Sequence, residues 1–110
     1  MRDSEIIESN IETARSIQKL RDNARKLVDN SLFKNVIENA YFTEEAARLV
    51  MCKMEPLTEP QLAQVDRMIY GVAAFKQFLK DIMRRGTDID NGIDEMEKEL
   101  QRALQEEAGN

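Results

Sequence analysis

Residues 61–85 read QLAQVDRMIYGVAAFKQFLKDIMRR, and the spacing of their apolar side chains predicts one long amphipathic helix. We expect nine of these apolar residues to face inward: Leu62, Val65, Ile69, Val72, Phe75, Phe78, Leu79, Ile82 and Met83. Small side chains at Gly71, Ala73 and Ala74 would let a neighbouring helix approach closely. The stretch therefore indicates an α-helical fold.

The residues on either side of this helix predict where it begins and ends. Thr58 and Gln61 have the spacing of a capping box, and proline is tolerated in a first turn at Pro60. Arg84 and Arg85 would complement the helix dipole, and Gly86 after them would supply a left-handed helix end. Thr87 and the acid after it would cap a further helix. We therefore expect a helix boundary at residues 86–87.

The segment after this boundary has the pattern of an acidic heptad helix. Its apolar residues step by four, three, four and three: Ile89, Ile93, Met96, Leu100 and Ala103. Residues 87–110 hold eight acids and two bases, which gives them a charge of −6. We expect residues 87–110 to form such a helix, with a frayed end.

The first 30 residues predict a long amphipathic helix from about Asp3 to about Asp29, with Ser4 near its cap. Four apolar positions in its second half step by three, four and three: Ile17, Leu20, Ala24 and Leu27. This is again a heptad seam, typical of coiled-coil partners.

The middle of the chain predicts the densest core. A cap at Asn30 and Ser31 precedes apolar residues spaced three and four apart: Leu32, Phe33, Val36, Ile37, Ala40 and Tyr41. Thr43 and the two acids after it resemble a fresh helix start. The pattern leaves open two short helices or one helix kinked near Phe42.

Together these elements predict an all-α fold of four or five helices. We expect one domain over residues 1–110, with a long helix at 1–30, a compact helical core at 31–86 and the acidic helix at 87–110. The core would be a helical bundle or hairpin, and the terminal helices would be coiled-coil-like.

The composition excludes much chemistry. The 110 residues have a net charge of −5, no His and one Cys, so imidazole triads and cysteine zinc clusters are absent. The acids at Asp88, Asp90 and Asp94 resemble a calcium loop, but Gly92 is out of register, and a helix start explains them better. We expect no enzyme activity, no cofactor, no metal and no catalytic residue.

Compartment and charge give further expectations. No run of about 18 apolar residues and no signal sequence is visible, and a lone Cys52 suits a reducing cytosol.

Four basic residues near the end of the long helix could contact nucleic acid: Lys76, Lys80, Arg84 and Arg85. The negative net charge favours ion pairing with acidic helices over that contact.

Two phrases in the middle of the chain carry a family resemblance. Residues 41–50, YFTEEAARLV, follow Leu32 and Phe33, and residues 72–79, VAAFKQFL, come later. Over residues 31–85 the chain resembles small all-helical proteins of tailed bacteriophages. The resemblance implies a phage origin and a location in the host cytoplasm or in the virion. The resemblance assigns no activity and no functional residue. The roles of small helical phage proteins of this kind include virion assembly, packaging and inhibition of host enzymes.

These observations predict a non-enzymatic interaction protein, a phage assembly or structural accessory that forms a homo-oligomer and docks helices on a protein partner. The candidate partner-binding residues lie on the two heptad seams: Ile17, Leu20, Leu27, Ile89, Ile93, Met96, Leu100 and Leu104. The alternatives are a DNA-packaging accessory that uses the basic helix face, and an acidic inhibitor or adaptor of a host enzyme.

Overall fold

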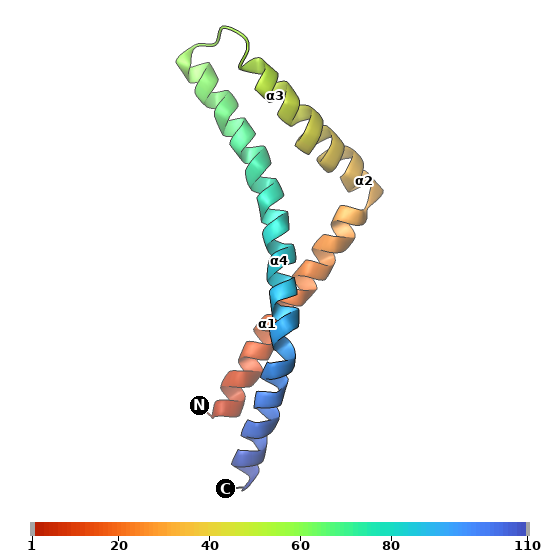
Figure 1. Ribbon diagram of the computed structural model, residues 1–110, viewed down its shortest axis with the longest axis vertical. Helices are drawn as coiled ribbons and strands as arrows, with labels where there is room; N and C mark the ends of the chain where they lie inside the picture. The colour runs from red at the N-terminus through yellow and green to blue at the C-terminus, as the bar shows by residue number, and fades with distance from the viewer. Residues whose placement is uncertain (1, 110) are drawn as a thin grey trace. The chain divides into compact units, whose positions relative to one another are not determined.

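The computed structural model describes residues 2–109, and within them it contains helices and no strand (Figure 1). The elements are α1 (Asp3–Asp29), α2 (Ser31–Phe33), η1 (Lys34–Glu45), α3 (Ala46–Cys52) and α4 (Glu59–Gly109). The elements α2, η1 and α3 follow one another without a break, so the described chain has three helical runs. The all-α prediction is confirmed, while the number of runs differs from the expected four or five.

The predicted helix boundary at Gly86 is wrong. Helix α4 continues through Gly86 and Thr87 to Gly109, and no glycine among the described residues has a positive φ. A Cβ built on Gly86 would overlap the Cβ and Cγ of Arg21. The glycine therefore provides room for a neighbouring helix, and it does not end its own.

The chain divides into two compact units. The end unit joins residues 2–24 to residues 82–109, and the middle unit comprises residues 25–81. Each unit therefore contains parts of both α1 and α4. This division differs from the expected segments 1–30, 31–86 and 87–110.

The end unit is an antiparallel pair of helices. Along α4 in this unit, one stripe of buried and half-buried residues steps regularly by four and three: Ile82, Gly86, Ile89, Ile93, Met96, Leu100, Ala103 and Glu107. The buried residues of α1 in this unit are Ser4, Ile11, Ala14, Arg21 and Ala24. The stripe predicted at residues 89–103 of the sequence therefore packs on α1 within the same chain.

The seam predicted on the first helix is only partly buried. Ala24 is buried and Ile17 is half-buried, but Leu20 is 52% exposed and Leu27 is 49% exposed. Two polar residues of α1, Ser4 and Arg21, are buried together with its apolar residues. Apolar spacing alone did not reveal this, because the partners of both polar side chains lie far away in the sequence.

The second helical run of the chain starts after a cap at Asn30, as predicted. The Asn30 Oδ1 accepts hydrogen bonds from the backbone N–H groups of Leu32 and Phe33, at 2.8 and 3.3 Å. Asn30 therefore separates α1 from the next helical run and caps the start of that run, which extends from Ser31 to Cys52.

Most of that run is a π-helix, η1, which replaces both alternatives left open by the sequence. The inward positions recur four to five residues apart at Phe33, Ile37, Tyr41–Phe42 and Ala46. This spacing is wider than that of an α-helix and matches i→i+5 hydrogen bonding, so the wider turn keeps all of them on one face.

Packing in the middle unit centres on the aromatic side chains. Phe42 and Phe75 have ring centroids 5.5 Å apart, and Tyr41 meets Phe75 edge-on at 6.3 Å. Four aliphatic and aromatic side chains of this unit are buried: Phe33, Leu49, Val72 and Leu79. The predicted central position of the aromatic segment is thus visible in its contacts with α4.

The connection between α3 and α4 follows the predicted capping box. The Thr58 N–H donates to the Gln61 Oε1 at 3.0 Å, and the Gln61 N–H donates to the Thr58 hydroxyl at 3.3 Å. Lys53 and Asp66 form an ion pair at 2.8 Å across this connection. None of the helices described is both long enough and apolar enough to span a membrane.

Candidate functional site

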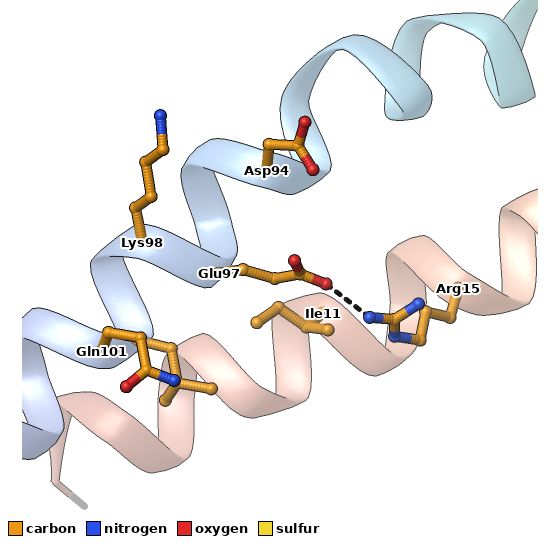
Figure 2. Close-up of a pocket in the computed structure, with 7 residues that line it drawn as sticks. Ile11, Arg15, Asp94, Glu97, Lys98 and Gln101 are labelled. Atoms are coloured by element: carbon orange, nitrogen blue, oxygen red, sulfur yellow. Dashed lines mark hydrogen bonds and ion pairs between the residues drawn. The ribbon is translucent and has the colours of Figure 1, made fainter.

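An open groove of about 510 Å³ lies between α1 and α4 in the end unit (Figure 2). Ile11 and Leu100 provide its apolar surface, and charged or amide side chains line the rest: Arg15, Asp94, Glu97, Lys98 and Gln101. Figure 2 shows Arg15 reaching from α1 to pair with Glu97 of α4. The ion pair bridges the two helices, so its charges are used in holding the pair together.

A buried arginine also joins the two helices of the end unit. Arg21 is only 7% exposed, and its guanidinium donates to both carboxylate oxygens of Asp90, at 2.7 and 3.1 Å. These hydrogen bonds, with a further one to Asp22, raise the pKa of Arg21. The guanidinium is therefore held as a cation inside the seam.

The start of α1 is capped by a residue near the end of α4. The Ser4 N–H and hydroxyl donate to the two carboxylate oxygens of Glu107, at 3.1 and 2.7 Å. These hydrogen bonds lower the pKa of Glu107. A carboxylate at a helix N-terminus is also favoured by the helix dipole. Ser4 was predicted near the cap, but its partner was not found from the sequence.

The predicted partner-binding residues fall into two groups. Ile93 is buried, and Ile89, Met96 and Leu100 are half-buried on the face of α4 that packs on α1. Leu20, Leu27 and Leu104 are exposed, and Ile17 is half-buried. Of the predicted residues, Leu20, Leu27 and Leu104 therefore offer the exposed apolar surface, and binding of a partner to them stays a prediction.

The candidate residues for nucleic-acid contact are all exposed on α4. Lys76 and Lys80 belong to the middle unit, whereas Arg84 and Arg85 belong to the end unit. The Lys76 ammonium lies 6.0 Å from the centroid of the Phe42 ring, in a cation–π arrangement. Lys76 thus has a structural contact of its own, and nucleic-acid binding by the four residues stays a prediction.

The middle unit exposes large apolar side chains that the sequence analysis placed inside or did not single out. On α4, Tyr70 is 75% exposed and Phe78 is 57% exposed, although Phe78 was predicted to face inward. Phe75 and Leu62, also predicted inward, are only partly covered. On the run from Ser31 to Cys52 and just after it, the exposed apolar residues are Leu32, Val36, Val50, Met51 and Met54. The exposed stripe on α4 was detectable from the spacing of Tyr70, Ala74 and Phe78.

No metal centre can be assigned within residues 2–109, since no group of three or more Cys, Asp or Glu side chains there is placed to hold an ion. The free Cys52 is half-buried and accepts a long contact of 3.7 Å from the Arg48 guanidinium. The sequence matches no protein-family model, and comparison with curated proteins and with solved structures gave no match.

Proposed function

We propose that the chain is a non-enzymatic interaction protein that serves as an assembly or structural accessory of a bacteriophage particle, acting through self-association and helix docking. The observation that carries this proposal is the apolar surface of the middle unit. Exposed apolar patches on a small protein mark sites of protein contact. The side chains of Leu32, Val36, Met51 and Met54 are all more than half exposed, the first two near the start of the run from Ser31 to Cys52 and the last two at its end and just beyond.

The composition of that surface suits docking on another protein. Methionine is unbranched and has a flexible thioether, so Met51 and Met54 can adapt to the shape of a partner. The packed part of the unit includes the buried Leu49 and the contact between the rings of Phe42 and Phe75. In helix-in-groove recognition, apolar side chains on a helix surface are the anchors that enter the groove of the partner.

The phage setting rests on the resemblance of residues 31–85 to small helical phage proteins. In the structure, the phrase at residues 41–50 supplies both the aromatic contacts to Phe75 and the buried Leu49. Residues 41–50 thus contribute to the core of the middle unit, and Val50 among them is exposed. A role in the host cytoplasm, in the particle, or in both belongs to this proposal.

The proposal is tested by sedimentation of particles and their precursors from cells that make the phage and a tagged chain. We expect the wild-type chain to sediment with particles or precursors. Val36→Glu and Met51→Glu should abolish this cosedimentation, because a buried carboxylate at the contact is costly. Asn35→Glu adds the same charge at the exposed residue beside Val36 and should have no effect.

Circular dichroism should show equal helix content for all of these proteins, which separates lost docking from lost folding. A wild-type chain that never sediments with particles or precursors would contradict the proposal. Equal cosedimentation of Met51→Glu and Asn35→Glu would contradict the role of the apolar surface.

A further inference from the structure

Helix α4 has two opposite apolar faces within the middle unit. One face is buried in the unit and includes Val72 and Leu79. On the opposite side, Tyr70 is 75% exposed and Phe78 is 57% exposed. A solvent-exposed helix face usually carries polar residues, so a second apolar face on the same helix indicates a second packing partner.

This second face forms a shallow groove of about 450 Å³. Its lining residues all come from α4: Tyr70, Ala73, Ala74, Gln77, Phe78 and Asp81. The two aromatic rings stand on either side of the small side chain of Ala74. Small residues at a crossing point let two helix axes approach to about 8 Å, so the groove has the shape that receives another helix.

The sequence of this face is symmetric about Ala74. Going outward, an aromatic residue lies four positions away on each side, at Tyr70 and Phe78. Seven positions away lie Arg67 before it and Asp81 after it, which have opposite charges. On a helix, residues spaced by three, four and seven lie on one face, so these five residues form one stripe.

Such a stripe is complementary to itself when two copies run antiparallel. With Ala74 of each copy at the crossing point, Tyr70 meets Phe78 of the second copy, and Arg67 meets Asp81 of the second copy. A two-fold axis repeats each contact, as in an isologous dimer. A parallel pair would place equal charges side by side, so the charges also select the orientation.

We propose that the stripe formed by Arg67, Tyr70, Ala74, Phe78 and Asp81 binds a second copy of this chain in antiparallel orientation. The Arg67 guanidinium donates to Gln64 at 2.7 Å, and Gln77 donates to Asp81 at 2.9 Å, so both charged side chains are held on α4 near the ends of the stripe. One pair of crossing helices buries less than the about 1,200 Å² of a standard stable interface. The dimer therefore dissociates on dilution.

This inference assigns a surface to the self-association included in the proposed function, but it does not depend on any phage particle. Light scattering of the full chain across a concentration series should show a mass that rises from monomer to dimer. Phe78→Glu should weaken dimerisation at least tenfold. Met51→Glu, on the proposed particle-docking surface, should leave dimerisation unchanged.

A charge swap tests the orientation. Arg67→Asp and Asp81→Arg should each weaken the dimer several-fold, because each places like charges opposite one another. The double variant should regain wild-type dimerisation, which a purely structural role of either residue would not produce.

Cross-linking tests the crossing point. In a Cys52→Ser background, Ala74→Cys should form a disulfide between copies under mild oxidation, because residue 74 lies on the two-fold axis. Lys80→Cys, which is exposed on another side of α4, should not.

A monomer at every concentration would overturn the inference. So would a dimer that is unaffected by Phe78→Glu, or a double charge variant no better than the single ones. Particle docking that fails while the dimer persists would overturn the proposed function alone.

Discussion

The side chain of Arg21 occupies the space into which a Cβ at position 86 would project. The atoms concerned are the Cβ and Cγ of Arg21, which lie close to its own backbone and cannot swing away as the guanidinium end could. Gly86 is buried and lies in the interior of α4, where glycine is a poor helix former. Packing between the two helices thus explains a residue that disfavours the helix containing it.

Gly86→Ala should destabilise the end unit although alanine favours a helix. Overpacking costs about 1–3 kcal/mol and the helix preference of alanine returns about 1 kcal/mol, so we expect a net loss of stability of up to about 2 kcal/mol. Gly92→Ala is the matched control, because a Cβ there meets nothing within 4 Å. It should stabilise the protein by up to about 1 kcal/mol. Urea unfolding of both variants measures the two free energies, and equal effects would contradict the close contact at Gly86.

Asp90→Asn should lower the melting temperature by several degrees. The change removes a charged acceptor that takes two hydrogen bonds from Arg21, while the guanidinium remains protonated at any ordinary pH. A cation that loses its main partner inside a seam is costly, although Asp22 retains one hydrogen bond to it. Thermal unfolding followed by circular dichroism measures the effect. Asp88→Asn, at an exposed position of the same helix, should change the melting temperature little, and equal shifts would contradict the role of the pair.

The contact between Ser4 and Glu107 should make stability depend on pH in the acid range. Its hydrogen bonds lower the pKa of Glu107 in the folded state, so the unfolded state binds a proton first as the pH falls. The stabilisation is therefore complete above the ordinary glutamate pKa of 4.5 and is lost as the pH falls through the lowered value. The wild type should be more stable than Glu107→Gln at pH 7, and this difference should shrink on acidification.

Thermal unfolding of both proteins at pH 7 and about pH 3 measures that change. Glu106→Gln, which alters the exposed neighbour, serves as the control for the general titration of acids. A difference between wild type and Glu107→Gln that stays constant over this range would contradict the assignment.

Thr58→Ala should destabilise the protein by about 1 kcal/mol, because it removes the hydroxyl that caps the start of α4. Thr13→Ala is the control, since Thr13 lies inside α1 and its hydroxyl donates only to the carbonyl of Ser9 in the preceding turn. Alanine there should be neutral or stabilising. Chemical unfolding gives both free energies, and a loss at Thr13 as large as at Thr58 would argue against the capping role.

The local signals in the sequence predicted local structure well. Asn30 and Thr58 were read as helix caps, and both make the expected hydrogen bonds, because a cap depends on residues within three positions. The all-α class followed from helical spacing along most of the chain. The spacing of four to five residues along Phe33, Ile37, Tyr41–Phe42 and Ala46 was also visible, but π-helices are rare, so an α-helical interpretation was the natural one.

The errors came from contacts between distant parts of the chain. Gly86 was taken for a helix end because glycine readily forms a left-handed end and two arginines precede it, whereas the close contact with Arg21, 65 positions earlier, explains it. Glu107 was taken for one acid of a charged tail, and its role depends on Ser4. Ile93 was taken for a docking residue, but α1 covers it. Tyr70 and Phe78 are exposed but were not among the candidate docking residues. Hydropathy does not reveal which of two apolar faces of a helix is already occupied.

The end unit is assembled from two segments that are far apart in the sequence and are therefore synthesised at different times. During synthesis, α1 leaves the ribosome with Ile11 and Ala14 uncovered, since their packing partners in residues 82–109 are translated only after residues 25–81. Contacts across a long intervening segment also carry the larger entropic cost of loop closure. During synthesis there is therefore a stage at which the middle unit can already fold, while the first helix still lacks its packing partner. At that stage the apolar stripe of the first helix is exposed to chaperones and to other chains.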